Sequence, residues 1–404
     1  MSMLPRETKT ALWILKVAEF FHLFVPILPV IVLIYQNKGV GLGDFFMIQG
    51  IFRIVAFLFE IPSGYLADVF SRRKILILGA LATFLSFSIL LFGTGFWAVL
   101  LCESGLGVAT ALFSGTKEAY IYDLLKRDGA EKTYLRENGS VNTIGTAGTM
   151  VGTLIGGALF AISQNLVLAV NAMAALIMFL ILFFIPEITE VKRKVAPESS
   201  PLRDCLKIVS MTARHPELPK LMLYSALYGT FATIVLWLMQ PVMVAALVPV
   251  ALFGVILGIN NVARMLCYKF AYKSIERLGN NKTLWLSVIW IFAGFWAALG
   301  AIWAAGNMPI VYVLCVIMAI VPAVQALVKL VFNGFIHERT ESHERGTVIS
   351  IGSMIKSGVS GVIMILLKPI LDSFGIVPTI ILFFALAFVL VVMLNPILRA
   401  VNRR

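Results

Sequence analysis

The chain has 404 residues, of which 60% are hydrophobic and only 13% are charged, and its mean hydropathy is +0.94. This composition excludes an ordinary soluble domain and indicates an integral membrane protein. The net charge is +12, but the cations cluster in short gaps between apolar runs, which is typical of membrane orientation. We therefore expect a lipid bilayer around the protein, and no nucleic acid as a partner.

Twelve apolar runs have the length, about 18 to 25 residues, that crosses a bilayer as a helix. They lie near 11–35, 44–63, 75–93, 97–122, 140–162, 165–185, 219–246, 250–271, 283–305, 309–335, 346–367 and 377–395. Several runs contain proline, which membrane helices tolerate, so we expect kinks and not breaks at Pro26, Pro29, Pro241 and Pro322.

The gaps between the runs alternate in charge. Counted from the N-terminus, the odd-numbered gaps (first, third, fifth and so on) carry almost no cation. The even-numbered gaps and both termini are basic. The rule that basic loops stay in the cytoplasm therefore predicts that both ends of the chain are cytoplasmic. We expect the protein to lie in a bacterial inner (plasma) membrane.

The longest polar interval divides the runs six and six. It predicts an N-terminal six-helix bundle at 1–186, a cytoplasmic linker at 187–218 and a C-terminal six-helix bundle at 219–404. Within the linker, Leu202 to Thr212 has the pattern of a short amphipathic helix that lies along the membrane face.

A short charged turn joins the second and third runs. It reads Gly64-Tyr65-Leu66-Ala67-Asp68-Val69-Phe70-Ser71-Arg72-Arg73-Lys74 and resembles the signature loop of the major facilitator superfamily, G-x-L-A-D-R-x-G-R-K. Val69 and Ser71 depart from that pattern. A degenerate second copy of this loop, from Glu276 to Lys282, follows the eighth run, at the equivalent place in the second half.

The resemblance implies an all-α integral membrane protein with twelve transmembrane helices in two pseudo-symmetric six-helix bundles. It also implies a central cavity that opens alternately to each side as the halves rock. The resemblance further implies gating residues on the cytoplasmic side, namely Gly64, Asp68, Arg72 and Asp123. Asp123 is expected to pair with Arg72, and Asp68 to meet the second half near 345–348; an ordinary interfacial salt bridge is the simpler alternative.

The fifth run contains glycines at a spacing of four. Its sequence resembles the G-x-x-x-G-P-x-x-G-G-x-L motif of drug–proton antiporters, although Thr153 replaces the proline. Such a stripe lets a neighbouring backbone approach closely, and we expect the eighth run of the second half to be that neighbour. The predicted helix-packing residues are Gly148, Gly152, Gly156 and Gly157.

Ionisable and amide side chains inside the runs are candidate site residues. All four acids of the runs lie in the first half, whereas the second half carries four cations, so the interior suits an anionic or zwitterionic solute. Lys16 in the first run and Lys269 in the eighth run have an alternative: their ammonium groups can extend to the membrane interface. The predicted substrate-binding residues are Arg53, Asn260, Arg264, Gln325, Lys329 and Lys356.

Proton coupling needs a carboxyl or imidazole group that titrates as access alternates. Glu19 and His22 are three apart on one helix face, and Glu60 is seven residues from Arg53 on the second run. We predict that Glu19, His22 and Glu60 couple transport to protons. A permanently paired structural cluster is the alternative interpretation.

The sequence holds no phosphate-binding loop, no metal-ligand spacing and no nucleophile motif. We therefore expect no enzyme, no metal and no cofactor other than the proton gradient. The resulting hypothesis is a monomeric, proton-coupled secondary transporter of a small organic anion, either a carboxylate-rich metabolite or a siderophore. The alternatives are a drug/proton antiporter for efflux of amphipathic compounds and, in a different class, a membrane-embedded enzyme or receptor.

Overall fold

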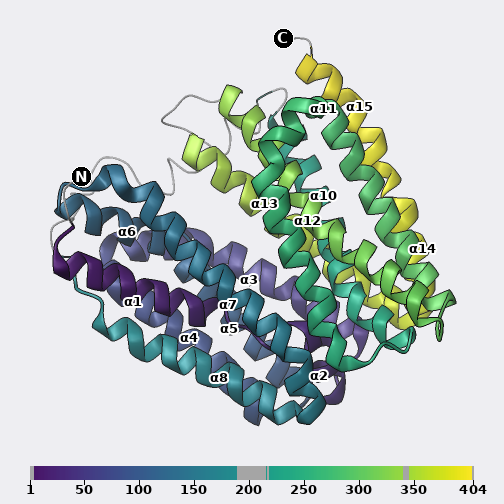
Figure 1. Ribbon diagram of the computed structural model, residues 1–404, viewed down its shortest axis with the longest axis horizontal. Helices are drawn as coiled ribbons and strands as arrows, with labels where there is room; N and C mark the ends of the chain where they lie inside the picture. Colours follow the sequence, from purple (N-terminus) through teal and green to yellow (C-terminus); the bar gives the residue numbers. More distant parts are fainter. Residues whose placement is uncertain (1–3, 189–214, 216–217, 340–344, 403–404) are drawn as a thin grey trace. The chain divides into compact units, whose positions relative to one another are not determined.

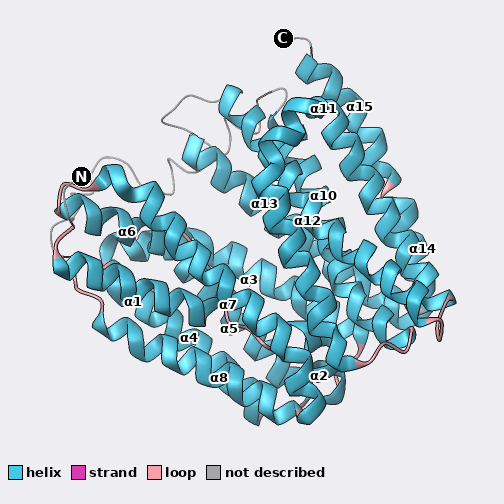
Figure 2. Ribbon diagram, in the orientation of Figure 1, coloured by secondary structure: helices cyan, strands magenta, loops and turns pink. Residues whose placement is uncertain are grey.

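The computed structural model describes residues 4–188, 215, 218–339 and 345–402. Every regular element in that part of the chain is helical, and short loops join the helices (Figure 2). Twelve helical segments are long and apolar enough to cross a membrane, at the positions that the hydrophobic runs predict. The expected fold class, an all-α integral membrane protein with twelve spans, is confirmed.

The chain forms two compact units. The first contains Met1–Asp44 and Ile51–Ala196, and the second contains Phe45–Gly50 and Pro197–Arg404. The predicted linker falls largely on residues 189–214 and 216–217, and its amphipathic helix at 202–212 falls wholly there, outside the described residues. The linker and its helix therefore stay predictions.

The first unit comprises the purple to teal elements of Figure 1. They are α1 (Arg6–Leu23), the 3-10 helix η1 (Leu28–Val30), α2 (Ile31–Asn37), most of α3 (Leu42–Val69), α4 (Arg72–Phe92), α5 (Gly95–Phe113), α6 (Thr116–Arg127), η2 (Glu131–Thr133), α7 (Tyr134–Ile162), α8 (Gln164–Ile181) and η3 (Leu182–Phe184). Helix α1 packs against α7 and α8, and α4 packs against α5 and α8.

The second unit comprises the green to yellow elements of Figure 1. They are α10 (Leu218–Ala245), η4 (Val250–Leu252), α11 (Phe253–Trp303), α12 (Met308–Arg339), α13 (Arg345–Phe374), α14 (Ile376–Leu386) and α15 (Phe388–Asn402). Helix α10 contacts α11, α12 and α13 and is the most buried of the spans in the described part of the chain.

The first span is broken, not kinked. Helix α1 ends at Leu23, and regular helix resumes only with η1 at Leu28. Pro26 and Pro29 both lack an N–H group, and a residue that precedes proline avoids the helical conformation, so two prolines three apart leave too few backbone hydrogen bonds to continue the helix. The expectation of simple kinks is therefore wrong at Pro26 and Pro29, whereas α10 continues through Pro241 and α12 continues through Pro322.

The fourth span is also interrupted. Helix α5 ends at Phe113 and α6 begins at Thr116, because Gly115 takes a φ of 72°, in the left-handed region that glycine adopts without strain. Gly279 takes a φ of 74° inside α11 and turns the chain between the eighth and ninth spans, within the predicted second copy of the signature loop.

The glycines of the fifth span lie against the broken first span. A Cβ atom at Gly148 would overlap the carbonyl oxygen of Phe20, one at Gly152 would lie 2.9 Å from Val25 N, and one at Gly156 would overlap the carbonyl oxygen of Pro26. The stripe therefore brings α7 onto the backbone of the same unit, and the expectation that the eighth span is its neighbour is wrong for these glycines. Gly157 is buried on the same helix.

We expect Gly148→Ala to destabilise the protein by about 1 to 3 kcal/mol, because the added methyl group meets main chain that has no room to move. Gly139→Ala on the same helix is the matched control, since no atom lies within 4 Å of its Cβ position, and alanine there favours the helix. Unfolding of both variants in detergent would test this. Equal or greater stability of Gly148→Ala relative to wild type would show that α7 and α1 are not in close contact at this residue.

Candidate functional site

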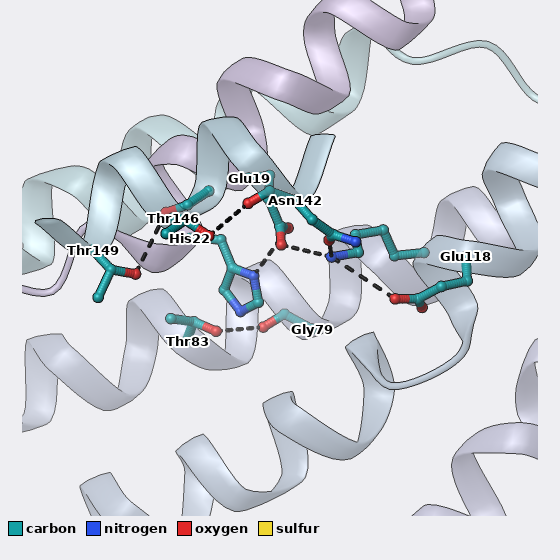
Figure 3. A network of polar contacts seen from close by, with 10 residues as sticks. Glu19, His22, Gly79, Thr83, Glu118, Asn142, Thr146 and Thr149 are labelled. Carbon is teal, nitrogen blue, oxygen red and sulfur yellow. Dashed lines mark hydrogen bonds and ion pairs between the residues drawn. The ribbon is translucent and has the colours of Figure 1, made fainter. Parts of the chain in front are cut away.

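A network of polar side chains surrounds Glu19 in the interior of the first unit (Figure 3). Lys117 Nζ donates to Glu19 Oε1 at 2.6 Å and to Asn142 Oδ1 at 3.0 Å. His22 Nδ1 lies 3.4 Å from Glu19 Oε2, and the imidazole ring stacks on Phe113 at a centroid distance of 4.3 Å. Glu19 is a buried carboxylate with a cation on one oxygen and an imidazole on the other.

Local sequence explains how these groups meet. Glu19 and His22 are three apart on α1 and so share a face. The turn at Gly115 ends α5 and lets α6 begin, which places Lys117 in the first turn of the new helix. On α7, Gly145 gives the space that Glu19 occupies, because a Cβ atom there would lie 2.7 Å from Glu19 Cγ.

Glu60 on α3 reaches the same interruption of the fourth span. Its carboxylate lies near the side chain of Ser114, directly before Gly115. The three residues predicted for proton coupling therefore lie around one break: His22 stacks on Phe113, Glu19 pairs with Lys117, and Glu60 lies near Ser114. The sequence predicted the acids but not the break that gathers them.

A second buried acid, Glu103, lies on α5. Tyr35 at the end of α2 donates its hydroxyl to Glu103 Oε1 at 2.5 Å, and both residues are almost inaccessible to solvent. Arg53 on α3 interacts electrostatically with Glu103, and Arg53 Nε has no hydrogen-bond partner among the described residues. Arg53, predicted to bind substrate, is thus within electrostatic range of an acid of its own unit.

In the second unit, two predicted residues meet at Gly229 on α10. A Cβ atom there would lie 2.6 Å from Gln325 Nε2 on α12 and 3.3 Å from Lys356 Nζ on α13. The absence of a side chain at Gly229 therefore allows an amide and an ammonium group from two other helices to approach the α10 backbone. The hydroxyls of Thr230 and Ser360 form a 2.6 Å hydrogen bond nearby.

The remaining predicted residues of the second unit are more dispersed. Asn260 is buried and donates to the carbonyl oxygen of Ala319 at 2.8 Å, in the turn of α12 that precedes Pro322. This bond supports a stretch of backbone that the proline perturbs. Arg264 and Lys329 are exposed, and neither joins the pair at Gly229.

One predicted gating contact is present. Arg72, in the first turn of α4, donates to Asp123 Oδ2 and to the carbonyl oxygen of Ala119 on α6. Gly64, Asp68 and residues 345–347 lie outside the part of the structure whose contacts are described, so the other predicted gating contacts stay predictions.

Sequence reasoning missed Lys117, Asn142 and the Tyr35–Glu103 pair as members of polar networks. A signal for Lys117 existed, because Ser114 and Gly115 interrupt an apolar run directly before it. The described residues contain no group of three or more His, Cys, Asp or Glu that would hold a metal ion.

Twelve helical spans in this chain order define the fold of a secondary transporter, not an enzyme. The chain belongs to the Major Facilitator Superfamily, whose family model matches residues 12–365. It is accordingly an integral membrane protein. No curated protein sequence matches it.

Solved structures share the fold across nearly the whole chain. Similarity to the nucleoside transporter NupG gives a TM-score of 0.78 at 15% identity, covering 97% of this chain and 98% of that one. Similarity to a mutant form of a peptide transporter, POT, gives 0.73 at 14% identity, covering 98% and 95%. The POT family transporter PepTSo gives 0.72 at 11% identity, covering 100% and 99%.

We expect Lys117→Met to destabilise the protein by about 3 to 5 kcal/mol, because it leaves the Glu19 carboxylate buried beside only an imidazole. The double variant Glu19→Gln/Lys117→Met should recover much of that loss, since it removes both charges. Unfolding in detergent provides the measurement.

Glu118→Gln is the control for this test. Its carboxylate is 3.9 Å from the same Lys117 nitrogen, but its side chain is 41% exposed, so the loss should stay below about 1 kcal/mol. Equal losses for Lys117→Met and Glu118→Gln would contradict a special role for the buried pair.

Proposed function

We propose that this protein is a proton-coupled secondary transporter that moves a small organic anion across the bacterial inner membrane by alternating access. The observation that carries the proposal is the buried pair of Glu19 and Lys117, joined at 2.6 Å and next to His22. A carboxylate in such a place is held either by its cation or by a proton, so its state depends on access to water.

The coupling step follows from the charges. Protonation of Glu19 removes the negative charge that holds Lys117 at 2.6 Å, and Asn142 Oδ1 remains as an acceptor for the ammonium group. The contact between α6 and α1 is weakened at the point where the fourth span is interrupted. Loss of the proton restores the ion pair. His22, at 3.4 Å, is placed to pass the proton to or from the carboxylate.

The placement of charged side chains in the second unit supports the proposed substrate class. Arg264, Lys329 and Lys356 lie inside its spans, whereas its acids among the described side chains, Glu276 and Asp372, lie near span ends. Lys356 beside Gln325 offers an ammonium and an amide donor to one oxyanion. We therefore favour a carboxylate-bearing solute, either a metabolite or a siderophore.

The antiporter alternative loses its main support. Its sequence basis was the glycine stripe of α7, which contacts the α1 backbone within the first unit and so has a structural explanation. The nucleoside and peptide transporters share the fold at 11 to 15% identity, which leaves the substrate of this chain open to direct screening.

We expect carboxylic acids to raise the unfolding temperature of the purified protein, because binding to the folded state stabilises it. The panel is di- and tricarboxylic acids, siderophores, nucleosides, dipeptides and cationic drugs. Stabilisation by cationic drugs alone would contradict the anion proposal.

For the carboxylate that stabilises most, Lys356→Gln should weaken binding about ten-fold or more, since a hydrogen bond to a charged group is lost. The control is Lys269→Gln in the same unit, whose exposed ammonium group lies over the Phe270 ring. If both variants bind as wild type does, Lys356 is not a ligand of the anion.

In liposomes, Glu19→Gln should still exchange that carboxylate between the two sides but should lose accumulation driven by a pH gradient, because the amide cannot carry a proton. Glu118→Gln should retain both activities. Gradient-driven accumulation by Glu19→Gln at the wild-type level would exclude Glu19 as the coupling residue.

A further inference from the structure

A surface pocket of about 370 Å³ lies on the first unit, between the first three turns of α1 and the start of α7. Three cations line it: Lys9 and Lys16 from α1, and Arg136 from α7. Its volume is within the range of small-ligand sites. The network around Glu19 does not include any of these three residues.

The pocket keeps an excess of positive charge. Its one acid, Glu137, is buried and is already engaged by two cations, Arg136 Nη2 at 2.8 Å and Lys16 Nζ at 3.4 Å. Lys9 is exposed and forms no ion pair with the residues that the structure describes. Arg136 uses Nε and Nη2 on Glu137 Oε1, so its Nη1 remains available in the described structure, and Ser140 adds a hydroxyl.

The rest of the wall is apolar. Trp13 stands between Lys9 and Lys16 on one face of α1, at spacings of four and three, and is 66% exposed. Leu4 and Leu12 complete the wall. Tryptophan favours the headgroup level of a bilayer, and the first three turns of a spanning helix, about 15 Å long, reach that level.

From these observations we infer that the pocket binds the phosphate headgroup of an anionic phospholipid. The phosphodiester oxygens accept from Lys9 Nζ, from Arg136 Nη1 and from the Ser140 hydroxyl, while Glu137 holds the two flanking cations in place. The glycerol and the first acyl carbons lie along Trp13 and Leu4. Free phosphate offers the same oxygens, but it leaves Trp13 and the leucines without a partner, which favours the lipid.

The test uses the full chain, purified in detergent and stripped of lipid, with bound lipid counted by native mass spectrometry. Phosphatidylglycerol should bind more tightly than phosphatidylcholine. Lys9→Gln/Arg136→Gln should weaken phosphatidylglycerol binding by roughly ten-fold to thirty-fold, given the attraction expected for each cation. The single variant Lys9→Gln, at an exposed position that need not affect folding, should show a smaller loss in the same direction.

The matched control is Lys132→Gln/Lys282→Gln, which removes two exposed cations elsewhere and should leave lipid binding unchanged. Phosphatidylglycerol with brominated chains should quench wild-type tryptophan fluorescence more than that of Trp13→Phe. The inference is overturned if the Lys9/Arg136 variant binds phosphatidylglycerol as wild type does. It is equally overturned if inorganic phosphate or glycerol 3-phosphate displaces the lipid at the lipid's own concentration.

Discussion

Hydrocarbon solvates neither a free backbone group nor an unpaired charge, and this constraint organises the first unit of the protein. Two of its spans are nevertheless interrupted, the first at 24–27 and the fourth at 114–115. The glycines of α7 bring backbone and small side chains against the first break. At the second break, Lys117 in the first turn of α6 pairs with the carboxylate of Glu19 on α1. Irregular backbone is thus covered by another helix at the first break, whereas Ser114 and Gly115 at the second break are exposed among the described residues.

The two units handle charge differently. In the first, acids and cations on different helices pair at short distances, as Glu19 and Lys117 do. In the second, Lys356 and Gln325 approach the same glycine on α10 from two other helices. Separating a buried ion pair costs free energy unless a proton neutralises the carboxylate in place of the cation. An ammonium group beside an amide donor, by contrast, suits an anionic solute. We therefore propose coupling in the first unit and solute recognition in the second.

Sequence patterns predicted neighbours only within one helix. The spacing of three placed Glu19 and His22 on one face, and the structure confirms their proximity at 3.4 Å. Lys117 lies 98 residues from Glu19 in the chain, so no local pattern connects the two. The same limit explains the error at the glycine stripe. Spacing showed that a backbone would approach Gly148, but not that this backbone would be Phe20.

By itself, the sequence determined the membrane class, the twelve spans and the family, because the length and apolarity of a span and a short signature loop are local properties. It also supplied the Arg72–Asp123 contact through that resemblance. Only the tertiary structure decided that Pro26 and Pro29 break the first span, and which cation neutralises Glu19. Both depend on neighbouring helices, since a break or a buried charge persists only where packing from elsewhere in the chain offsets its cost.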